Sequence, residues 1–203
     1  LAPQGIIEAK LVGQLLKEQH INIDICFSSY LKRAIRSQWI VLENADQMHV
    51  DCIYSWKLNE RHYGTWQGQN KDEILKLVGE NDYLFVRRGM HQAPPPLTLD
   101  DKRHPQYDSN YKNIETNILP STESLKDTQN RVVNYFYEAI VTELAQDKTV
   151  LVTAHGNSIR ALMAKLENRS DAETPLIDVP TGILFSYEFD KQLNLVAHEK
   201  LTP

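Results

Sequence analysis

A histidine follows directly after a β-branched apolar run near the C-terminal end of the sequence. Residues 148–153 read Lys-Thr-Val-Leu-Val-Thr, and His155 and Gly156 precede an amphipathic segment that reaches Met163. This order predicts a buried strand, a tight turn and a helix. His155 would then lie at the end of a parallel strand, where anionic ligands bind in open α/β sheets. Taken alone, a histidine in such a turn is equally well explained by a structural hydrogen bond.

A second group of chemically capable side chains occupies residues 58–64, which read Leu-Asn-Glu-Arg-His-Tyr-Gly. The segment has too little periodicity for a helix, so we expect a loop at the end of a strand over residues 48–54. Glu60 is the candidate proton carrier, and Arg61 suits an anionic substrate. A surface loop of salt bridges is the alternative interpretation.

Three cations, Lys32, Arg33 and Arg36, lie in the first turns of a helix expected over residues 28–43. Ser28 or Ser29 would be its N-cap. Cations at a helix N-terminus oppose the helix dipole, at roughly 0.3–1 kcal/mol each when exposed. A bound anion would reverse this cost. A solvated basic face explains the segment when it is considered by itself.

The remaining elements follow from hydrophobic periodicity. We expect helices over residues 4–20, 71–78, 82–88 and 121–146, a strand over 23–27, and a closing antiparallel hairpin over 183–197. The helix over residues 28–43 would bury Leu31, Ile35, Trp39 and Leu42. Residues 94–120 are rich in Pro, Asp, Asn and Tyr, which predicts a long loop or lid. We expect one α/β domain over residues 1–203.

Composition excludes several classes of partner. The formal net charge of -5 argues against a general nucleic-acid or membrane-surface binder. No apolar run is long enough for a transmembrane helix. Cys26 and Cys52 each lie inside an apolar run, which favours buried thiols in a reducing cytoplasm over a disulfide. No metal is expected, because the ligand spacing of a zinc site is missing from His62, His91, His104 and His198.

Several motifs, taken in order, resemble those of the cofactor-dependent phosphoglycerate mutases. They are residues 28–36, residues 58–64, Asn70-Lys71, Arg87-Arg88, residues 94–96, residues 123–127 and residues 154–158. The resemblance spans nearly the whole chain. The histidine phosphatase superfamily at large shares an arginine and a second histidine, whereas the Asn-Glu-Arg-His-Tyr-Gly string and the arginine pair resemble the mutase itself.

The resemblance implies a three-layer α/β/α fold with a mainly parallel central sheet. It also implies interconversion of 2- and 3-phosphoglycerate, in glycolysis and gluconeogenesis, through a phosphohistidine primed by 2,3-bisphosphoglycerate. A cytoplasmic homodimer or homotetramer is expected, acting on a small phosphorylated metabolite without a metal. Two alternatives stay open: a phosphatase of the same superfamily, and a non-catalytic protein that keeps only the anion pocket.

The resemblance also assigns roles to residues. Arg33 and His155 would contact the transferring phosphoryl group, and Glu60 would exchange a proton with the substrate hydroxyl. Eight residues would bind the rest of the substrate: Arg61, His62, Tyr63, Lys71, Arg87, Arg88, Gly156 and Asn157. The basic side chains that are unfavourable in an empty site would then have an anionic partner.

One departure from the family pattern concerns the nucleophile. In these mutases the nucleophilic histidine lies in an Arg-His-Gly motif on the first strand, upstream of the segment equivalent to Gln4-Gly5. None of the seven histidines in this sequence follows a strand in that pattern near Leu1. We therefore expect a longer native chain that contains this strand. Without the strand, the core should show a gap and two exposed strand edges.

Overall fold

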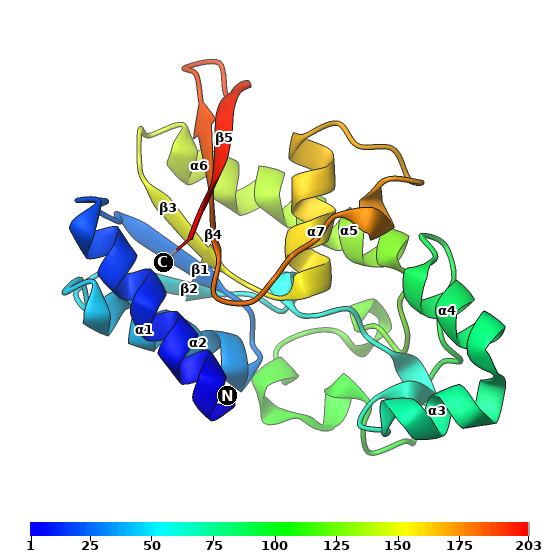
Figure 1. The fold of residues 1–203 in the computed structure, drawn as a ribbon. Coiled ribbons are helices and arrows are strands. Elements are labelled where there is room, and N and C mark those ends of the chain that lie inside the picture. Colours follow the sequence, from blue (N-terminus) through cyan, green and yellow to red (C-terminus); the bar gives the residue numbers. More distant parts are fainter. Residues whose placement is uncertain (203) are drawn as a thin grey trace.

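A three-stranded parallel sheet lies at the centre of the molecule, which a computed structural model describes over residues 1–202 (Figure 1). The strands are β1 (Ile25–Ser28), β2 (Cys52–Tyr54) and β3 (Val150–Thr153), in the order β2-β1-β3. All four residues of β1 are buried. A strand covered on both faces is continuously apolar rather than alternating, as the sequence Ile-Cys-Phe at its start shows.

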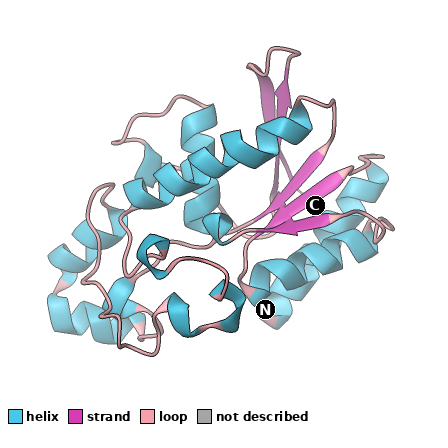
Figure 2. Ribbon diagram, turned by 180° about the vertical axis from the view of Figure 1, so that it is seen from behind, coloured by secondary structure: helices cyan, strands magenta, loops and turns pink. Residues whose placement is uncertain are grey.

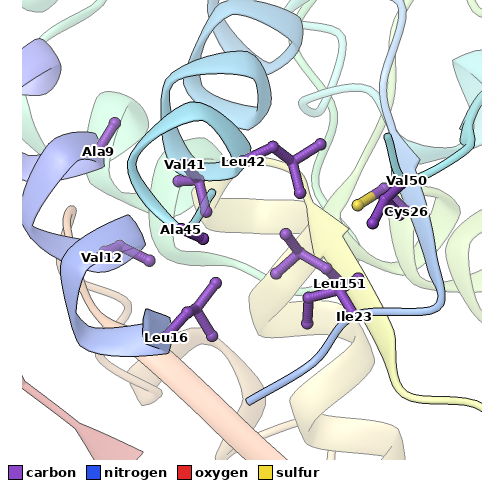
Figure 3. Close-up of a cluster of buried hydrophobic side chains, with 10 residues drawn as sticks. All are labelled: Ala9, Val12, Leu16, Ile23, Cys26, Val41, Leu42, Ala45, Val50 and Leu151. Atoms are coloured by element: carbon purple, nitrogen blue, oxygen red, sulfur yellow. The ribbon is translucent and has the colours of Figure 1, made fainter. Parts of the chain in front are cut away.

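Helices α1 (Pro3–Glu18) and α2 (Lys32–Asn44) cover one face of this sheet. Figure 3 shows Leu16 of α1 and Val41 of α2 gathered around Leu151 of β3. Close contact between the two helices requires Gly13, because a Cβ at that position would lie 2.4 Å from the carbonyl oxygen of Val41. The helix over residues 4–20 is thus confirmed, and it buries Ala9, Val12, Leu15 and Leu16, whereas Ile7 and Leu11 are exposed.

The opposite face is covered by a long helix and by α7 (Gly156–Leu166). The long helix consists of α5 (Leu125–Tyr135), a π-helical turn (Phe136–Ile140) and α6 (Val141–Leu144). Its N-terminus is fixed by a capping box between Ser124 and Asp127. Phe27 of β1 packs against this layer. The three-layer α/β/α arrangement expected from the sequence is therefore confirmed.

The predicted C-terminal hairpin is present as β4 (Leu184–Phe189) and β5 (Leu195–Leu201), which form a separate antiparallel sheet (Figure 2). In the part of the chain that the structure describes, no strand pairs with the outer edge of β3 or with the free edge of β4. Between these edges lies an apolar groove of about 870 Å³, lined by residues that include Val150, Val152, Leu162, Leu166, Leu184 and Phe189. These two unpaired edges and the groove between them agree with the gap expected in the core.

The remaining helices are α3 (Lys71–Val78) and α4 (Glu80–Arg88), both close to their predicted bounds. Asn70 caps α3 by accepting a hydrogen bond from the Asp72 backbone N–H. Residues 94–120 contain only the 3₁₀ turns Pro105–Tyr107, Ser109–Tyr111 and Thr116–Ile118, which confirms the predicted long loop. No helix within residues 1–202 is long and apolar enough to cross a membrane.

Two expectations for α2 are wrong. The residue at its N-cap is Leu31, whose side chain has no capping group. Ser28 ends β1, and the Ser29 hydroxyl lies two residues before the N-cap, where it bonds to His155 and accepts from the Leu31 N–H. Trp39 is 61% exposed, and Gln38 is buried in its place. The helix is therefore rotated about its axis relative to the face that the apolar residues alone predicted.

Candidate active site

His155 and Arg33 meet because their strands are neighbours. Ser28, the last residue of β1, is in register with Thr153, the last residue of β3. The chain beyond each strand therefore emerges at the same edge of the sheet. There the Arg33 Nε donates a hydrogen bond to His155 Nδ1 at 3.0 Å. The sequence predicts His155 at a strand end and Arg33 in the first turns of a helix, and the sheet register brings the two into contact.

The hydrogen bonds of His155 define its protonation state. Arginine can only donate, so His155 Nδ1 must be the acceptor and the ring proton lies on Nε2. That nitrogen lies 2.7 Å from the Ser29 hydroxyl. Burial, and then the positive charges of Arg33 and Arg131, lower the pKa of His155 to about 3. The imidazole is therefore neutral and fixed in one tautomer.

Glu60 lies against the N-terminus of α7. Its Oε1 accepts hydrogen bonds from the backbone N–H of Arg61 at 2.8 Å and of Asn157 at 3.2 Å. The partial positive charge of the helix N-terminus favours a carboxylate at this position. The Asn157 side chain in turn donates to the Tyr63 hydroxyl at 3.0 Å. A Cβ on Gly156 would lie 4.0 Å from Glu60 Oε2, so a side chain there would fill the space beside the carboxylate.

A cavity of about 730 Å³ opens beside these groups. Seven of the predicted site residues line it: Arg33, Glu60, Arg61, His62, Tyr63, Lys71 and Arg87. His155, Gly156 and Asn157 adjoin it through their contacts with Arg33 and Glu60. Arg88 is exposed and does not line the cavity. Its charge lies close enough to Arg160 to lower the pKa of that arginine, after the larger effect of burial.

Arg61 is far more buried than a simple substrate ligand, with 2% of its surface exposed. Its Nε donates to the Glu123 carbonyl at 2.8 Å, and its Nη2 donates to the carbonyls of Gln92 at 2.6 Å and Val86 at 3.2 Å. Nη1 is buried without a partner among the described residues. Arg61 therefore ties the loop over residues 58–64 to the end of α4 and the segment after it.

Gly64 holds the same loop against residues 94–96. Its φ of +52° is in the left-handed region, and a Cβ would lie 2.1 Å from the Pro95 carbonyl oxygen. The Gly64 backbone N–H donates to His62 Nδ1 at 3.1 Å. Burial is the main cause of the lowered pKa of His62.

Several site residues were not found from the sequence. Ser29, which binds His155, carried the only usable signal, because it is a small polar residue directly after a strand. Glu123 and Arg131 form a buried ion pair behind Glu60 that joins α5 to the loop. Nothing local marks such a pair, since the partners meet only in the folded chain. Within residues 1–202, no three His, Cys, Asp or Glu side chains are grouped to hold a metal ion.

The chain matches the family model of the histidine phosphatase superfamily (branch 1) over residues 1–101 and 89–199. Solved structures give the same fold: Bacillus stearothermophilus YhfR, with a TM-score of 0.70 and 18% identity, is matched over 97% of this chain and 81% of that one. The α-ribazole phosphatase from Shigella flexneri has a TM-score of 0.67 and 18% identity, over 97% of this chain and 82% of that one. At such identities the likeness concerns the fold alone.

More similar sequences narrow the assignment. A 2,3-bisphosphoglycerate-dependent phosphoglycerate mutase of Nautilia profundicola is 50% identical over 96% of this chain and 85% of that protein. A protein of the same name from Treponema denticola is 44% identical over 99% of this chain and 81% of that protein. The chain belongs to the histidine phosphatase superfamily and, within it, to the family of these two mutases.

Proposed function

We propose that the protein interconverts 2- and 3-phosphoglycerate and depends on 2,3-bisphosphoglycerate as primer. The arrangement that carries the proposal lies at the N-terminus of α7, where His155 is the N-cap bonded to Arg33 and Glu60 accepts from the Asn157 N–H. The cavity beside it is lined by Lys71 and Arg87. The names and extensive identity of the two bacterial relatives support the same reaction. When bound, the bisphosphate would supply the phosphoryl group that primes the enzyme.

Arg33 and His155 would stabilise the transferring phosphoryl group. Phosphoryl transfer depends mainly on positioning and on neutralising charge at the moving oxygens. Arg33 supplies a permanent cation, and its bond to Nδ1 leaves the His155 proton on Nε2, where it faces the Ser29 hydroxyl. A dianion at this point would favour the charged form of His155 and raise its pKa above about 3.

Glu60 would be the acid and base for the substrate hydroxyl. Its Oε1 is held by two backbone N–H groups, whereas Oε2 faces the space beside Gly156. One oxygen therefore fixes the orientation of the carboxylate, and the other is available to the proton. The asymmetry suits a group that must give and take one proton without moving.

The rest of the substrate would be held by the cationic lining of the cavity. Lys71 and Arg87 contribute positive charge, and Tyr63 and Asn157 contribute a hydrogen-bonded pair beside Glu60. The carboxylate and the second phosphate would be bound here, and Arg61, His62, Arg88 and Gly156 complete the proposed set. Arg88 would have to reorient to take part, because it does not line the cavity.

The nucleophilic histidine would come from a strand in the apolar groove. A strand that paired with β3 in parallel would end beside His155, since β3 itself ends two residues before it. The resemblance places an Arg-His-Gly motif on such a strand, upstream of Leu1. Finding that motif in the native protein, and losing the phosphoenzyme when its histidine becomes alanine, is the expected result. A phosphoenzyme that survives the substitution would refute this assignment.

The activity itself is tested by following the conversion of 3- to 2-phosphoglycerate by the native protein. We expect isomer formation to require added 2,3-bisphosphoglycerate and to be much faster than phosphate release. Phosphate release as the main reaction would support the phosphatase alternative instead. Activity that required manganese and not the bisphosphate would contradict the proposal.

A homodimer, alone or within a tetramer, is the proposed assembly, and the protein is proposed to act in the cytoplasm. The outer edge of β2 has no partner strand within the described chain, and four large apolar side chains near it are exposed: Trp39, Met48, Ile53 and Tyr54. Such a patch beside an open edge is typical of an interface. Cys26 and Cys52 are free thiols, as in a reducing compartment. Sedimentation of the native protein and of Trp39→Glu tests the assembly, and a monomeric native protein would contradict it.

A further inference from the structure

Arg131 projects from α5 toward the loop that carries Glu60. Its side chain is 10% exposed, and that of its ion-pair partner Glu123 is 5% exposed. The Arg131 guanidinium also lies 6.0 Å from the centre of the Trp56 ring, in the 3₁₀ turn that begins this loop. The pair is therefore buried behind the candidate acid and base rather than at the surface.

Every N–H of the Arg131 guanidinium has a partner. Arginine carries five such donors. Nε and Nη2 donate to the two oxygens of Glu123 at 2.5 and 2.8 Å. The other three donate to backbone carbonyls: Nη1 to Lys57 at 2.9 Å and Asn59 at 3.0 Å, and Nη2 to Glu60 at 3.2 Å. No donor is left for a substrate phosphate, although Arg131 borders the cavity.

Glu123 holds the other side of the same loop. Its Oε2 accepts from the His62 backbone N–H at 2.8 Å, and its own backbone N–H donates to the His62 carbonyl at 2.9 Å. The Glu123 carbonyl accepts from Arg61 Nε. The backbone on both sides of Glu60 is thus fixed by one buried ion pair, through carbonyls before it and an N–H after it.

We propose that Arg131 and Glu123 are positioning residues that orient Glu60 for proton transfer. This inference rests on the proposed function, because it gives the pair a role in that reaction. Misplacement of a catalytic group by about 1 Å can lower turnover about 100-fold. Lysine at position 131 keeps the charge but offers three donors on one nitrogen in place of the planar fork. Arg131→Lys should therefore lower kcat roughly 100-fold and change KM little.

The decisive experiment is a double-mutant cycle of Arg131→Lys with Glu60→Gln in the native protein, with kcat and KM measured for 3-phosphoglycerate. If Arg131 acts through Glu60, Arg131→Lys should lower kcat less than about threefold once Glu60 is already glutamine. The control is Arg169→Lys, which changes an arginine paired with Glu167 outside the site. We expect this control to leave kcat and KM unchanged.

A second measurement is independent of activity. The His62 amide should exchange with deuterium at least tenfold faster in Arg131→Lys than in the native protein, while amides of β1 stay protected. Unchanged exchange at His62 overturns the proposal, as does an equal loss of kcat with and without Glu60. A native protein without mutase activity overturns the proposed function instead, and the exchange experiment then still decides whether Arg131 holds the loop.

Discussion

Two hollows in the molecule are similar in volume but differ in their lining. One is the cavity at the ends of the parallel strands, about 730 Å³, and the other is the groove between β3 and β4, about 870 Å³. Around the cavity, Arg33, Glu60 and Arg131 are held by hydrogen bonds within the protein. Along the groove, two strand edges have no strand partner within residues 1–202, and the lining is largely apolar. The cavity is thus prepared for a small anion, whereas the groove suits another strand.

The largest expected effect is that of Glu60→Gln on the cavity. Glutamine keeps an oxygen that can accept from the Arg61 and Asn157 backbone N–H groups, so the loop should be retained. It cannot act as a general base, and we expect kcat to fall about 10²–10⁴-fold with the affinity for 2,3-bisphosphoglycerate within about threefold. Steady-state kinetics and calorimetric titration measure the two quantities. Turnover near that of the native protein would show that Glu60 is not the acid and base.

Glu123→Gln tests whether the wall of the cavity depends on its buried charge pair. The substitution leaves the buried Arg131 without a counterion, and the free energy of unfolding should fall by about 3–5 kcal/mol. Glu143→Gln is the control, because Glu143 pairs with the more exposed Lys148. That change should cost less than about 1 kcal/mol. Urea denaturation measures the free energy of unfolding of both variants. Equal losses would show that the Glu123–Arg131 pair contributes no more to stability than the more exposed Glu143–Lys148 pair.

Shortening a side chain that lines the groove should lower the free energy of unfolding less than shortening a side chain in the closed core. Leu42 is 4% exposed between α2 and the sheet, whereas Leu162 is half-buried and lines the groove. In the chain of 203 residues, Leu42→Ala should lower the free energy of unfolding by about 2–5 kcal/mol and Leu162→Ala by less than about 1.5 kcal/mol. The same denaturation experiment applies. A larger loss for Leu162→Ala would mean that the groove is already tightly packed.

The smallest effect concerns pH and His155. Its pKa is about 3 in the folded chain, against an ordinary value of 6.5 that applies to the unfolded chain. Below pH 6.5 the unfolded chain binds a proton that the folded chain does not. The free energy of unfolding therefore decreases as the pH is lowered. Between pH 7 and pH 5 the loss should be about 2 kcal/mol. His155→Asn should lack this contribution, whereas His62 contributes equally to both proteins. Parallel curves of unfolding free energy against pH would show that His155 is not held neutral.

Local patterns in the sequence were sufficient for most elements. The strand, turn and helix around His155, the cap at Asn70 and the C-terminal hairpin all follow from short-range periodicity and turn chemistry. Trp39 was misplaced because tertiary contacts, and not the apolar residues of α2 alone, set the rotation of that helix. The expectation of a gap came from comparison with a family pattern, not from the residues present.

The site was predictable in its residue types and less so in its contacts. His155 could be placed at a strand end and Arg33 in the first turns of a helix, but their hydrogen bond depends on the register of β1 with β3. The sequence predicts that Arg61 binds substrate beside Glu60. In the structure its side chain is buried and donates to backbone carbonyls. The pairing of Glu123 with Arg131 depends on how α5 packs against the loop, and sequence spacing carries no information about it.

The most direct test of the proposed reaction is the fate of a labelled phosphoryl group. The native protein is incubated with 2,3-bisphosphoglycerate labelled in its phosphoryl groups, and the protein is then separated and mixed with unlabelled 3-phosphoglycerate. We predict an acid-labile label on a histidine that passes to phosphoglycerate much faster than to water. A protein that takes up no label, or that releases its label mainly as inorganic phosphate, would contradict a mutase built on Arg33, Glu60 and His155.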